Sequence, residues 1–308
     1  MGRRPAKKKH HRDVDGVLLL DKPLGMSSNQ ALQRLKHLMR AHKAGHTGSL
    51  DPLATGCLPL CFGEASKVSS YLLDADKHYD TVARLGLVTD TDDAEGEVIR
   101  EAPVVLPDRA GLLSLLERFI GDQAQIPPMY SALHHEGQRL YNLARQGKTV
   151  ELAPRHVHVS RLELVDVGDN TLSLSISCSK GTYIRSLVRD IGLALGCGAH
   201  VQALRRTGVD PFTTPQMISL DEAIDLADQG LLESKLLATD EVLINMPILA
   251  LDEEQCARIK SGQKVTLDAA VDTGQELLRL YDPAGGFVGI GERDNLSLKA
   301  KRLMATGT

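Results

Sequence analysis

The sequence predicts an α/β protein with a smaller β-rich domain at its C-terminal end. Hydrophobic residues alternate over 156–178, as in a β-hairpin, and recur at helical spacing over 28–42 and 184–195. From residue 277 onward, short apolar runs are separated by turns rich in Gly, Asp and Asn, which predicts the β-rich domain. With 308 residues, 42% of them hydrophobic, the chain is long enough for one large domain or two.

The N-terminal residues are strongly basic. Residues 1–12 hold six Lys and Arg residues and no acidic residue, so we expect a disordered, solvated tail whose charge is compatible with phosphate contacts. The formal net charge of −4 argues mildly against a strongly basic nucleic-acid binder. The apolar run that follows, 16–20, is too short for a signal peptide or a membrane span. We therefore expect a cytoplasmic protein with no membrane partner.

Cysteine and aromatic usage argues against a zinc site, disulfides and RNA binding through stacked rings. No Cys-x-x-Cys motif occurs, and the cysteines are scattered and odd in number. Both observations favour reduced thiols over a zinc site or disulfides. Those cysteines are Cys57, Cys61, Cys178, Cys197 and Cys256. Only 3% of the residues are aromatic and none is Trp, so RNA binding through rows of stacked aromatic rings is not expected.

Local patterns predict the elements of the first half in order. Residues 17–20 read as a buried strand, and a capping box of Ser27 and Gln30 begins a helix that extends to about residue 42. Loose alternation over 79–88 predicts a strand. A helix is expected from 108 until a glycine ends it at 121.

Two segments between these elements have less regular patterns. The acidic segment 89–96 fails the calcium-loop pattern and reads as a solvated turn. Residues 126–152 combine several basic side chains with a short helical patch, which is consistent with a mobile surface hairpin. After the hairpin at 156–178, a further capping box of Ser219 and Glu222 begins another helix.

A run of fourteen residues, 45–58, places three glycines and a proline around one carboxylate, that of Asp51. Glycine allows backbone angles that other residues resist, and proline fixes its own φ, so a rigid irregular loop is expected. The alternative is an ordinary helix start, with Asp51 as the N-cap and Pro52 in the first turn. The flanking His-Thr-Gly and Ala-Thr-Gly triplets favour the loop, because a simple cap does not need them.

A second motif, Ser-Lys-Gly-Thr-Tyr-Ile-Arg-Ser-Leu, occupies residues 179–187 and begins the helix at 184–195. It puts Arg185 in the first helical turn, where the helix dipole disfavours a positive charge. A carboxylate from elsewhere in the chain would offset that penalty. The alternative is a surface arginine that pairs with Asp190 or with nothing.

Together these two motifs resemble the TruB-type tRNA pseudouridine synthases, which isomerise uridine 55 in the T loop of tRNA. The resemblance covers residues of about 15–250 and is weaker beyond them. It implies a catalytic domain at 13–249 around a mixed, largely antiparallel sheet, an RNA-gripping insertion at 126–152 and a PUA-like RNA-binding domain at 250–308. It also implies tRNA as the partner, a monomer, and no cofactor, metal or guide RNA.

The resemblance further implies roles for individual residues. Asp51 matches the family's nucleophile, and Arg185 would keep that carboxylate ionised by lowering its pKa. Tyr79 would stack on the flipped base and could accept the sugar proton, and His46 would fill the space that the base vacates. The remaining substrate contacts that it implies are Lys22, Gly48, Thr182, Tyr183 and Leu204, the last as a wall of the pocket.

Some choices stay open at this point. Asp51 could attack the sugar carbon, attack the uracil ring, or begin by promoting glycal formation. A non-catalytic module that grips the T arm is the main alternative function, although gripping needs no carboxylate beside RNA phosphates. A phosphohydrolase that uses Asp51 is a weaker alternative, because the sequence has no metal-ligand cluster.

Overall fold

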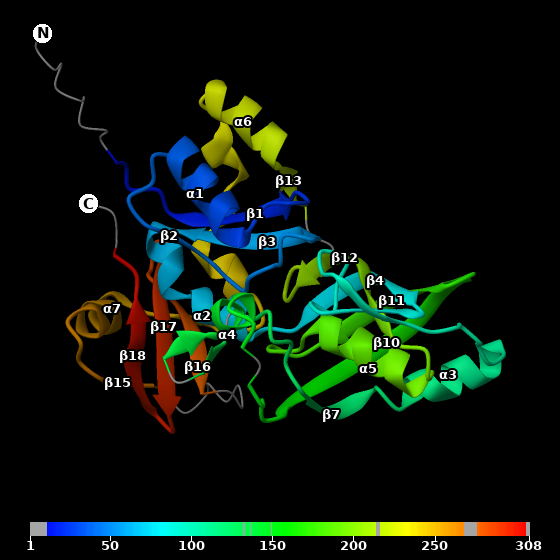
Figure 1. Ribbon diagram of the computed structural model, residues 1–308. Helices are drawn as coiled ribbons and strands as arrows, with labels where there is room; N and C mark the ends of the chain where they lie inside the picture. The colour runs from blue at the N-terminus through cyan, green and yellow to red at the C-terminus, as the bar shows by residue number, and fades with distance from the viewer. Residues whose placement is uncertain are drawn as a thin grey trace, which may run out of the picture.

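The computed structural model describes residues 11–131, 133–135, 137–148, 150–213, 216–267 and 276–305. These residues form a large sheet with helices on its faces and a separate five-stranded C-terminal sheet (Figure 1). Most of the basic tail, residues 1–10, lies outside the described residues. Arg12 belongs to the fold, because its backbone pairs with that of Ala41 and its guanidinium lies 2.7 Å from the Glu233 carboxylate.

The large sheet has nine strands in the order β13-β1-β3-β12-β4-β11-β10-β7, with β2 paired to β3. The pairs β1–β13 and β3–β12 are parallel and the others are antiparallel, which confirms the predicted mixed, mainly antiparallel sheet. Its strands are β1 (Gly16–Lys22), β2 (Ala44–His46), β3 (Ala54–Phe62), β4 (Lys77–Leu85), β7 (Gly121–Gln125), β10 (Arg155–Gly168), β11 (Thr171–Cys178), β12 (Ala199–Val209) and β13 (Ile218–Ser219).

Apart from α2, which was not predicted, the helices of this part lie where the sequence predicted them, with some shifts at their ends. They are α1 (Ser28–Leu38), α2 (Ser69–Asp74), α3 (Arg109–Glu117), α4 (Leu140–Arg145), α5 (Ile184–Ala194) and α6 (Leu220–Asp228), with the 3-10 segments η1 (Gly63–Lys67), η2 (Leu232–Lys235) and η3 (Thr239–Leu243). The predicted capping box of Ser27 and Gln30 begins α1. This helix ends before the predicted residue 42, because Arg40 has a φ of +53°, which no α-helix accommodates.

Two small hairpins complete the domain. They are β5 (Leu87–Thr89) with β6 (Val98–Glu101), and β8 (His134–His135) with β9 (Gln138–Arg139). The first contributes the acidic turn between its strands, and the second lies with α4 in the predicted insertion.

Strands β1 and β3 are buried on both faces, which explains why they read as continuous apolar runs. In β1, Leu18 and Leu20 pack into the main core with α1, whereas Val17 and Leu19 pack into a second cluster. That second cluster includes Val242 from η3 and reaches the C-terminal domain. The arrangement fixes β3 near the middle of the sheet, and the loop before β3 carries Asp51.

The other half of the sheet is covered on one face only. Helix α5 packs against it through Ile184, Val188 and Ile191, which are buried with Leu174 of β11 in the main core. On the opposite face, polar residues such as Ser173 and Ser175 alternate with these core positions. The loop that carries Asp51 meets this part of the domain where α5 begins.

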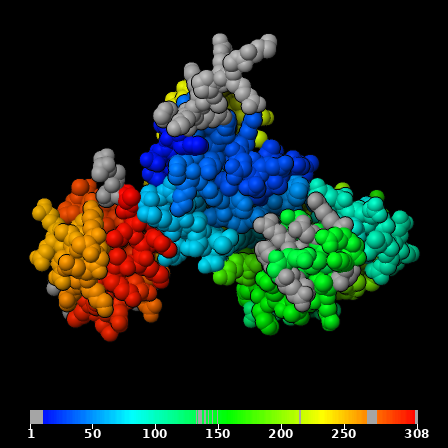
Figure 2. Space-filling view, turned by 60° about the vertical axis from the view of Figure 1, so that its left-hand side comes forward, coloured from blue at the N-terminus to red at the C-terminus, as the bar shows by residue number. Residues whose placement is uncertain are grey.

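The predicted β-rich C-terminal domain is confirmed. It contains β14 (Ile248–Ala250), α7 (Glu253–Lys260), β15 (Val265–Thr266), β16 (Leu277–Tyr281), β17 (Phe287–Asp294) and β18 (Ser297–Leu303), in the sheet order β14-β16-β17-β18-β15. Figure 2 shows it as a lobe apart from the lobe formed around residues 110–150. The Lys67 ammonium donates to the Leu303 carbonyl at 3.1 Å and helps to join this domain to the first.

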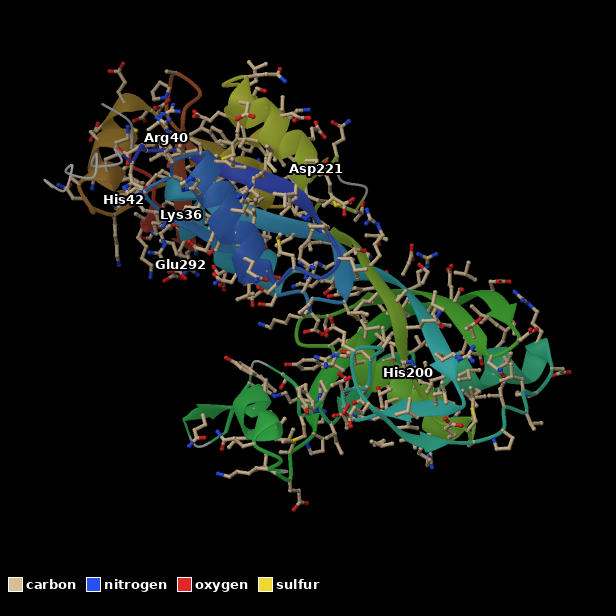
Figure 3. All side chains as sticks on the ribbon, turned by 45° about the horizontal axis from the view of Figure 1, so that its top comes forward. Lys36, Arg40, His42, His200, Asp221 and Glu292 are labelled. Atoms are coloured by element: carbon tan, nitrogen blue, oxygen red, sulfur yellow. The ribbon has the colours of Figure 1, made fainter. Side chains whose placement is uncertain are left out.

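The structure also places the basic residues near α1, the cysteines and the apolar segments. Lys36 and Arg40 lie on or just after α1, far from His200 in the other half of the molecule (Figure 3). The five cysteines are all buried and free. Within the described ranges, no helix combines the length and apolar character needed to cross a membrane.

Candidate active site

Asp51 lies on the irregular loop that joins β2 to β3. Two glycines of the predicted motif, Gly48 and Gly56, have φ angles of +86° and +98°, which side-chain-bearing residues rarely adopt. A Cβ atom on Gly56 would also lie only 2.2 Å from the Arg206 carbonyl oxygen. Glycine is therefore required at position 48 by the backbone angle, and at position 56 by the backbone angle and a close chain approach.

The alternative of a helix start at Asp51 is wrong. The backbone NH of Ala54 donates to the Asp51 carbonyl at 3.0 Å, closing a tight turn that leads directly into β3. The carboxylate is therefore not used as a helix cap. It is free to face the space between the loop and α5.

Arg185 provides the partner that the helix start requires. It follows the N-cap residue Tyr183 of α5, and its Nη2 atom lies 2.9 Å from Oδ2 of Asp51. Only 5% of the Arg185 side chain is exposed. The local alternative is wrong, because Asp190 pairs with Arg189 at 2.9 Å instead.

The acidic turn after β5 holds the same guanidinium from the other side. Nη1 of Arg185 lies 3.4 Å from Oδ2 of Asp93 and donates to the Thr91 carbonyl at 3.0 Å, and Nη2 donates to the Tyr130 carbonyl at 2.8 Å. Asp93 in turn accepts from the Thr91 hydroxyl at 2.6 Å and from the Glu95 NH at 3.0 Å. The prediction of a solvated turn is wrong for Asp93, which is buried.

The pKa of Asp51 lies above its ordinary value. Burial raises it most, the Arg185 guanidinium opposes that effect, and the Asp93 carboxylate raises it further. The prediction that Arg185 leaves the pKa lowered is therefore wrong in the net balance, although its own effect has the predicted sign. Because 43% of the Asp51 side chain is exposed to the pocket, solvent still supports the ionised form alongside the ion pair.

Asp93→Asn is expected to move the acid limb of the pH–rate profile to lower pH. The substitution removes a negative charge that raises the pKa of Asp51, so Asp51 stays ionised to a lower pH. It also removes one partner of Arg185, so the rate at neutral pH should fall about 10-fold or more. Single-turnover rates across pH measure both effects. Asp92→Asn, which breaks a 3.1 Å pair with Arg189, is the control and should leave the limb in place; an upward shift for Asp93→Asn would contradict this electrostatic account.

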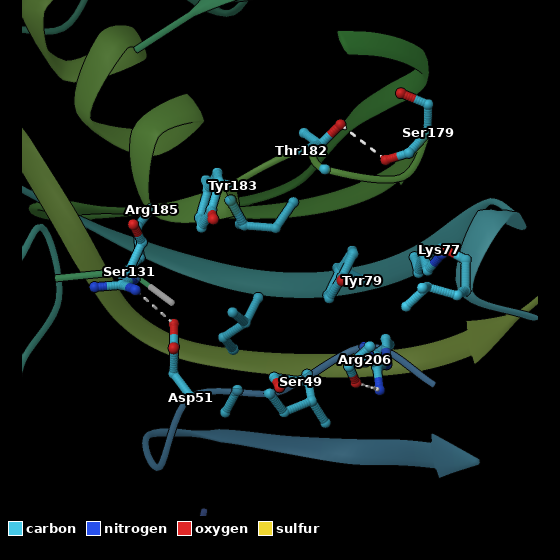
Figure 4. Close-up of a pocket in the computed structure, with 17 residues that line it drawn as sticks. Ser49, Asp51, Lys77, Tyr79, Ser131, Ser179, Thr182, Tyr183, Arg185 and Arg206 are labelled. Carbon is cyan, nitrogen blue, oxygen red and sulfur yellow. Dashed lines mark hydrogen bonds and ion pairs between the residues drawn. The ribbon is translucent and has the colours of Figure 1, made fainter. Parts of the chain in front are cut away.

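A pocket of about 310 Å³ opens beside the Asp51–Arg185 pair (Figure 4). Its size lies near the lower end for small-ligand sites. Seven of the nine residues predicted for the site line it, namely Gly48, Asp51, Tyr79, Thr182, Tyr183, Arg185 and Leu204. Sequence-distant motifs thus converge on one cavity.

Strand register explains how the pocket wall is assembled. β12 pairs with β3 so that Leu204 lies beside Ala54, just after the Asp51 loop. β12 also pairs with β4 so that Arg206 lies opposite Tyr79. The pairing therefore brings side chains of all three strands to the same cavity.

The two remaining predicted residues do not line this pocket but lie near Asp51. His46 lines a neighbouring pocket of about 750 Å³ that shares Asp51 and Arg185 with the first. Its Nδ1 atom is buried without a hydrogen-bond partner among the described residues, and burial lowers its pKa. Lys22 lines neither pocket: it is fully buried, its ammonium donates to the Pro23 and Met26 carbonyls, and burial lowers its pKa to about 8.

Sequence reasoning missed two cationic residues of the pocket, Lys77 and Arg206. Arg206 follows Leu204 by two positions, and residues two apart on a strand share a face. That spacing could have identified it.

Burial raises the pKa of Tyr79, while the charge of Arg206 and its hydrogen bond to Tyr79 oppose the effect. Among the described residues, no group of three or more His, Cys, Asp or Glu side chains is placed to hold a metal ion.

Three family models match successive segments of the chain. The model described as TruB family pseudouridylate synthase (N terminal domain) matches residues 36–184. The model described as tRNA pseudouridylate synthase B C-terminal domain matches residues 185–246. The model described as Pseudouridine synthase II TruB, C-terminal, matches residues 247–304. The three matches include every residue of the pocket.

Curated relatives resemble the chain over nearly its whole length. The tRNA pseudouridine synthase B of Pseudomonas aeruginosa is 50% identical over 301 residues, covering 96% of this chain and 98% of that protein. The protein of the same name from Nitrosococcus oceani is 50% identical over 282 residues, covering 91% of each. A solved H/ACA ribonucleoprotein bound to a substrate RNA containing 2′-deoxyuridine has a chain with a TM-score of 0.71 at 22% identity, covering 94% of this chain and 85% of that one. At that identity the likeness supports the fold alone.

Proposed function

This chain belongs to the TruB family of pseudouridylate synthases, and from that premise we propose that it isomerises uridine 55 of tRNA with Asp51 as the nucleophile. Members of this family are isomerases, and this chain is one of them. The observation that carries the assignment of the site is the 2.9 Å ion pair between Asp51 and Arg185 at the wall of a nucleobase-sized pocket. A module that only grips RNA has no use for a carboxylate held in this way.

The fixed guanidinium of Arg185 gives Asp51 its direction and its charge. Arg185 is held by two backbone carbonyls and two carboxylates, so it cannot turn away to meet a phosphate without losing them. Its positive charge favours the ionised carboxylate, which is the nucleophilic form. The attack itself can begin at the sugar carbon, at the uracil ring or through a glycal, and each course uses the same carboxylate.

Tyr79 and Leu204 are proposed to hold the flipped base. Both line the pocket, from neighbouring strands, and a ring face and an aliphatic side chain suit the two faces of a planar base. Because burial raises the pKa of Tyr79, its hydroxyl keeps its proton at neutral pH. Stacking is therefore the better supported role, and acceptance of the sugar proton is the weaker one. Tyr183 and Thr182 line the same cavity where the ribose would enter.

The RNA partner is proposed to be the T stem-loop of tRNA, recognised mainly through its shape and phosphates. His46, in the neighbouring pocket, would fill the place of the extruded base. The insertion at 126–152, the basic residues 1–12 and a PUA-like domain at 250–308 would add contacts. We propose a cytoplasmic monomer that needs no guide RNA and no cofactor.

Turnover of isolated RNA hairpins tests this choice of partner. We expect the chain to convert uridine to pseudouridine in a T stem-loop at a rate within about 10-fold of whole tRNA, because the pocket and its neighbour hold only a flipped nucleotide and its surroundings. An anticodon stem-loop of equal length is the matched control and should not react. Equal conversion of both hairpins would contradict recognition of the T arm, without affecting the assignment as an isomerase.

A further inference from the structure

Arg206 is a buried cation without a matching anion. Only 1% of the residue is exposed, and no carboxylate forms an ion pair with it within the part of the chain that the structure describes. Its Nε donates to the Cys57 carbonyl at 2.6 Å and its Nη2 to the Gly48 carbonyl at 3.1 Å. A buried charge is unfavourable unless it is compensated, so its retention here calls for a reason.

The position of this charge within the pocket suggests that reason. Register places Arg206 directly opposite Tyr79, the residue proposed to stack on the base. Figure 4 shows Arg206 and Lys77 at the end of the cavity away from the Asp51–Arg185 pair. Lys77 is also buried; its ammonium donates to the Leu72, Leu73 and Ala75 carbonyls, and burial lowers its pKa to about 8, so it is still mainly cationic at neutral pH. The cavity thus has a carboxylate at one end and two buried cations at the other.

The chemistry of the isomerisation creates a negative charge that such cations would meet. If the N1–C1′ bond breaks first, its electron pair leaves with the uracil ring and is shared among N1 and the two carbonyl oxygens. If Asp51 instead adds to C6 of the ring, the displaced electron pair moves to the C4 oxygen as an enolate. In every course the N1–C1′ bond is broken and C5 bonds to C1′. Where Asp51 has bonded to C6 or C1′, that bond breaks and the carboxylate is released, and in the glycal course the proton taken from the sugar is returned to it. The C5 proton is then lost and N1 takes up a proton, so the product is an isomer of the substrate.

We propose that Arg206, supported by Lys77, is a catalytic residue that stabilises the negative charge on the uracil ring while the glycosidic bond is exchanged. The inference rests on the proposed function, and it holds for each order of bond breaking that remains open. Preorganised positive groups in a water-poor site are effective at this task, because they need no rearrangement when charge develops. The bonds to Gly48 and Cys57 supply that preorganisation.

The neighbouring arginine provides a matched control. Arg205 lies one residue earlier on β12 and therefore points to the opposite face of the sheet. There its guanidinium bonds both carboxylate oxygens of Asp21, at 2.9 and 2.7 Å. Arg205→Gln removes the same charge from the same strand without reaching the cavity.

The test compares single-turnover rates of Arg206→Gln, Arg206→Lys and Arg205→Gln on saturating tRNA. We expect Arg206→Gln to lose about 100-fold or more in rate with tRNA affinity nearly unchanged, and Arg206→Lys to recover most of that loss. A second substrate carries 5-fluorouridine at the target position, and loss of the starting nucleoside is measured. Fluorine helps the ring to carry negative charge. The decrease in rate that Arg206→Gln causes should therefore be clearly smaller on this substrate than on the natural one.

Two results would overturn the proposal. One is an equal loss for Arg206→Gln on both substrates, since a residue that only braces the Gly48 loop lowers every rate alike. The other is a rate close to wild type without the charge. If Arg206→Gln does not fold, the size of the effect of Arg206→Lys on the natural substrate decides, because lysine keeps the charge but weakens the brace: a rate within about 10-fold of wild type supports the proposal, and a rate about 100-fold or more below wild type overturns it. If the wild-type protein makes no pseudouridine, the proposed function itself is contradicted. Failure of the proposed function can therefore be distinguished from failure of the proposal for Arg206.

Discussion

Asp51→Asn is expected to abolish pseudouridine formation while tRNA affinity remains within about threefold of wild type. The amide has nearly the shape of the carboxylate but lacks its charge and its nucleophilic oxygen. Removal of a covalent nucleophile typically lowers the rate by about 1000-fold or more. Single-turnover conversion of a tRNA transcript measures the rate, and filter binding measures the affinity.

Asp80→Asn is the matched control for this variant. Asp80 is an exposed residue of β4 that directly follows Tyr79. Its side chain lines a different groove from the one that holds Asp51. Its loss changes the net charge equally but leaves the pocket intact, so the rate should stay close to wild type. Continued turnover by Asp51→Asn would show that the nucleophile has been misassigned.

Arg185→Leu should lose rate far more than binding and should also destabilise the fold. The guanidinium lies between two carboxylates, and its removal leaves buried Asp93 without its cation. Breaking a buried ion pair by removing one partner destabilises a protein by about 3–5 kcal/mol, and the partial exposure of Asp51 places this case at the lower end. Denaturant unfolding measures the free energy, and single-turnover kinetics measures the rate.

Arg185→Lys separates charge from geometry in the same site. Lysine keeps the charge but cannot reproduce the planar fork that meets Asp51, Asp93 and the two carbonyls together, so an intermediate rate is expected. Arg189→Leu, which removes an arginine one turn further along α5, is the control and should lose much less rate. If Arg185→Leu weakens tRNA binding as much as it slows the reaction, the guanidinium contacts phosphate instead.

Sequence alone could predict those features that depend on local pattern. The capping box at Ser27, the 156–178 hairpin and the irregular loop around Asp51 each follow from residues close together in the chain. The end of α1 could not be placed in this way, because no residue in its sequence announces the positive φ of Arg40. The residues that follow Leu38 have a helix-like sequence, although the chain turns there.

The features that were missed depend on contacts between distant strands and turns. Asp93 looks like any other acid of a polar turn until Arg185 is brought against it from α5. Arg206 looks like part of a basic stretch until β12 is inserted between β3 and β4. The net direction of the pKa of Asp51 was likewise out of reach, because burial and the Asp93 charge depend on the folded structure. The resemblance of the two motifs to a known family located the reacting groups, and tertiary packing determines their electrostatics.

The most direct measurement is position-by-position mapping of pseudouridine in a tRNA transcript after incubation with the purified wild-type chain. If Asp51 and Arg185 form the working site of this family member, pseudouridine appears at position 55 and nowhere else, and a transcript with cytidine at that position stays unmodified. Pseudouridine at another position, or tRNA that is bound but left unchanged, would contradict the account.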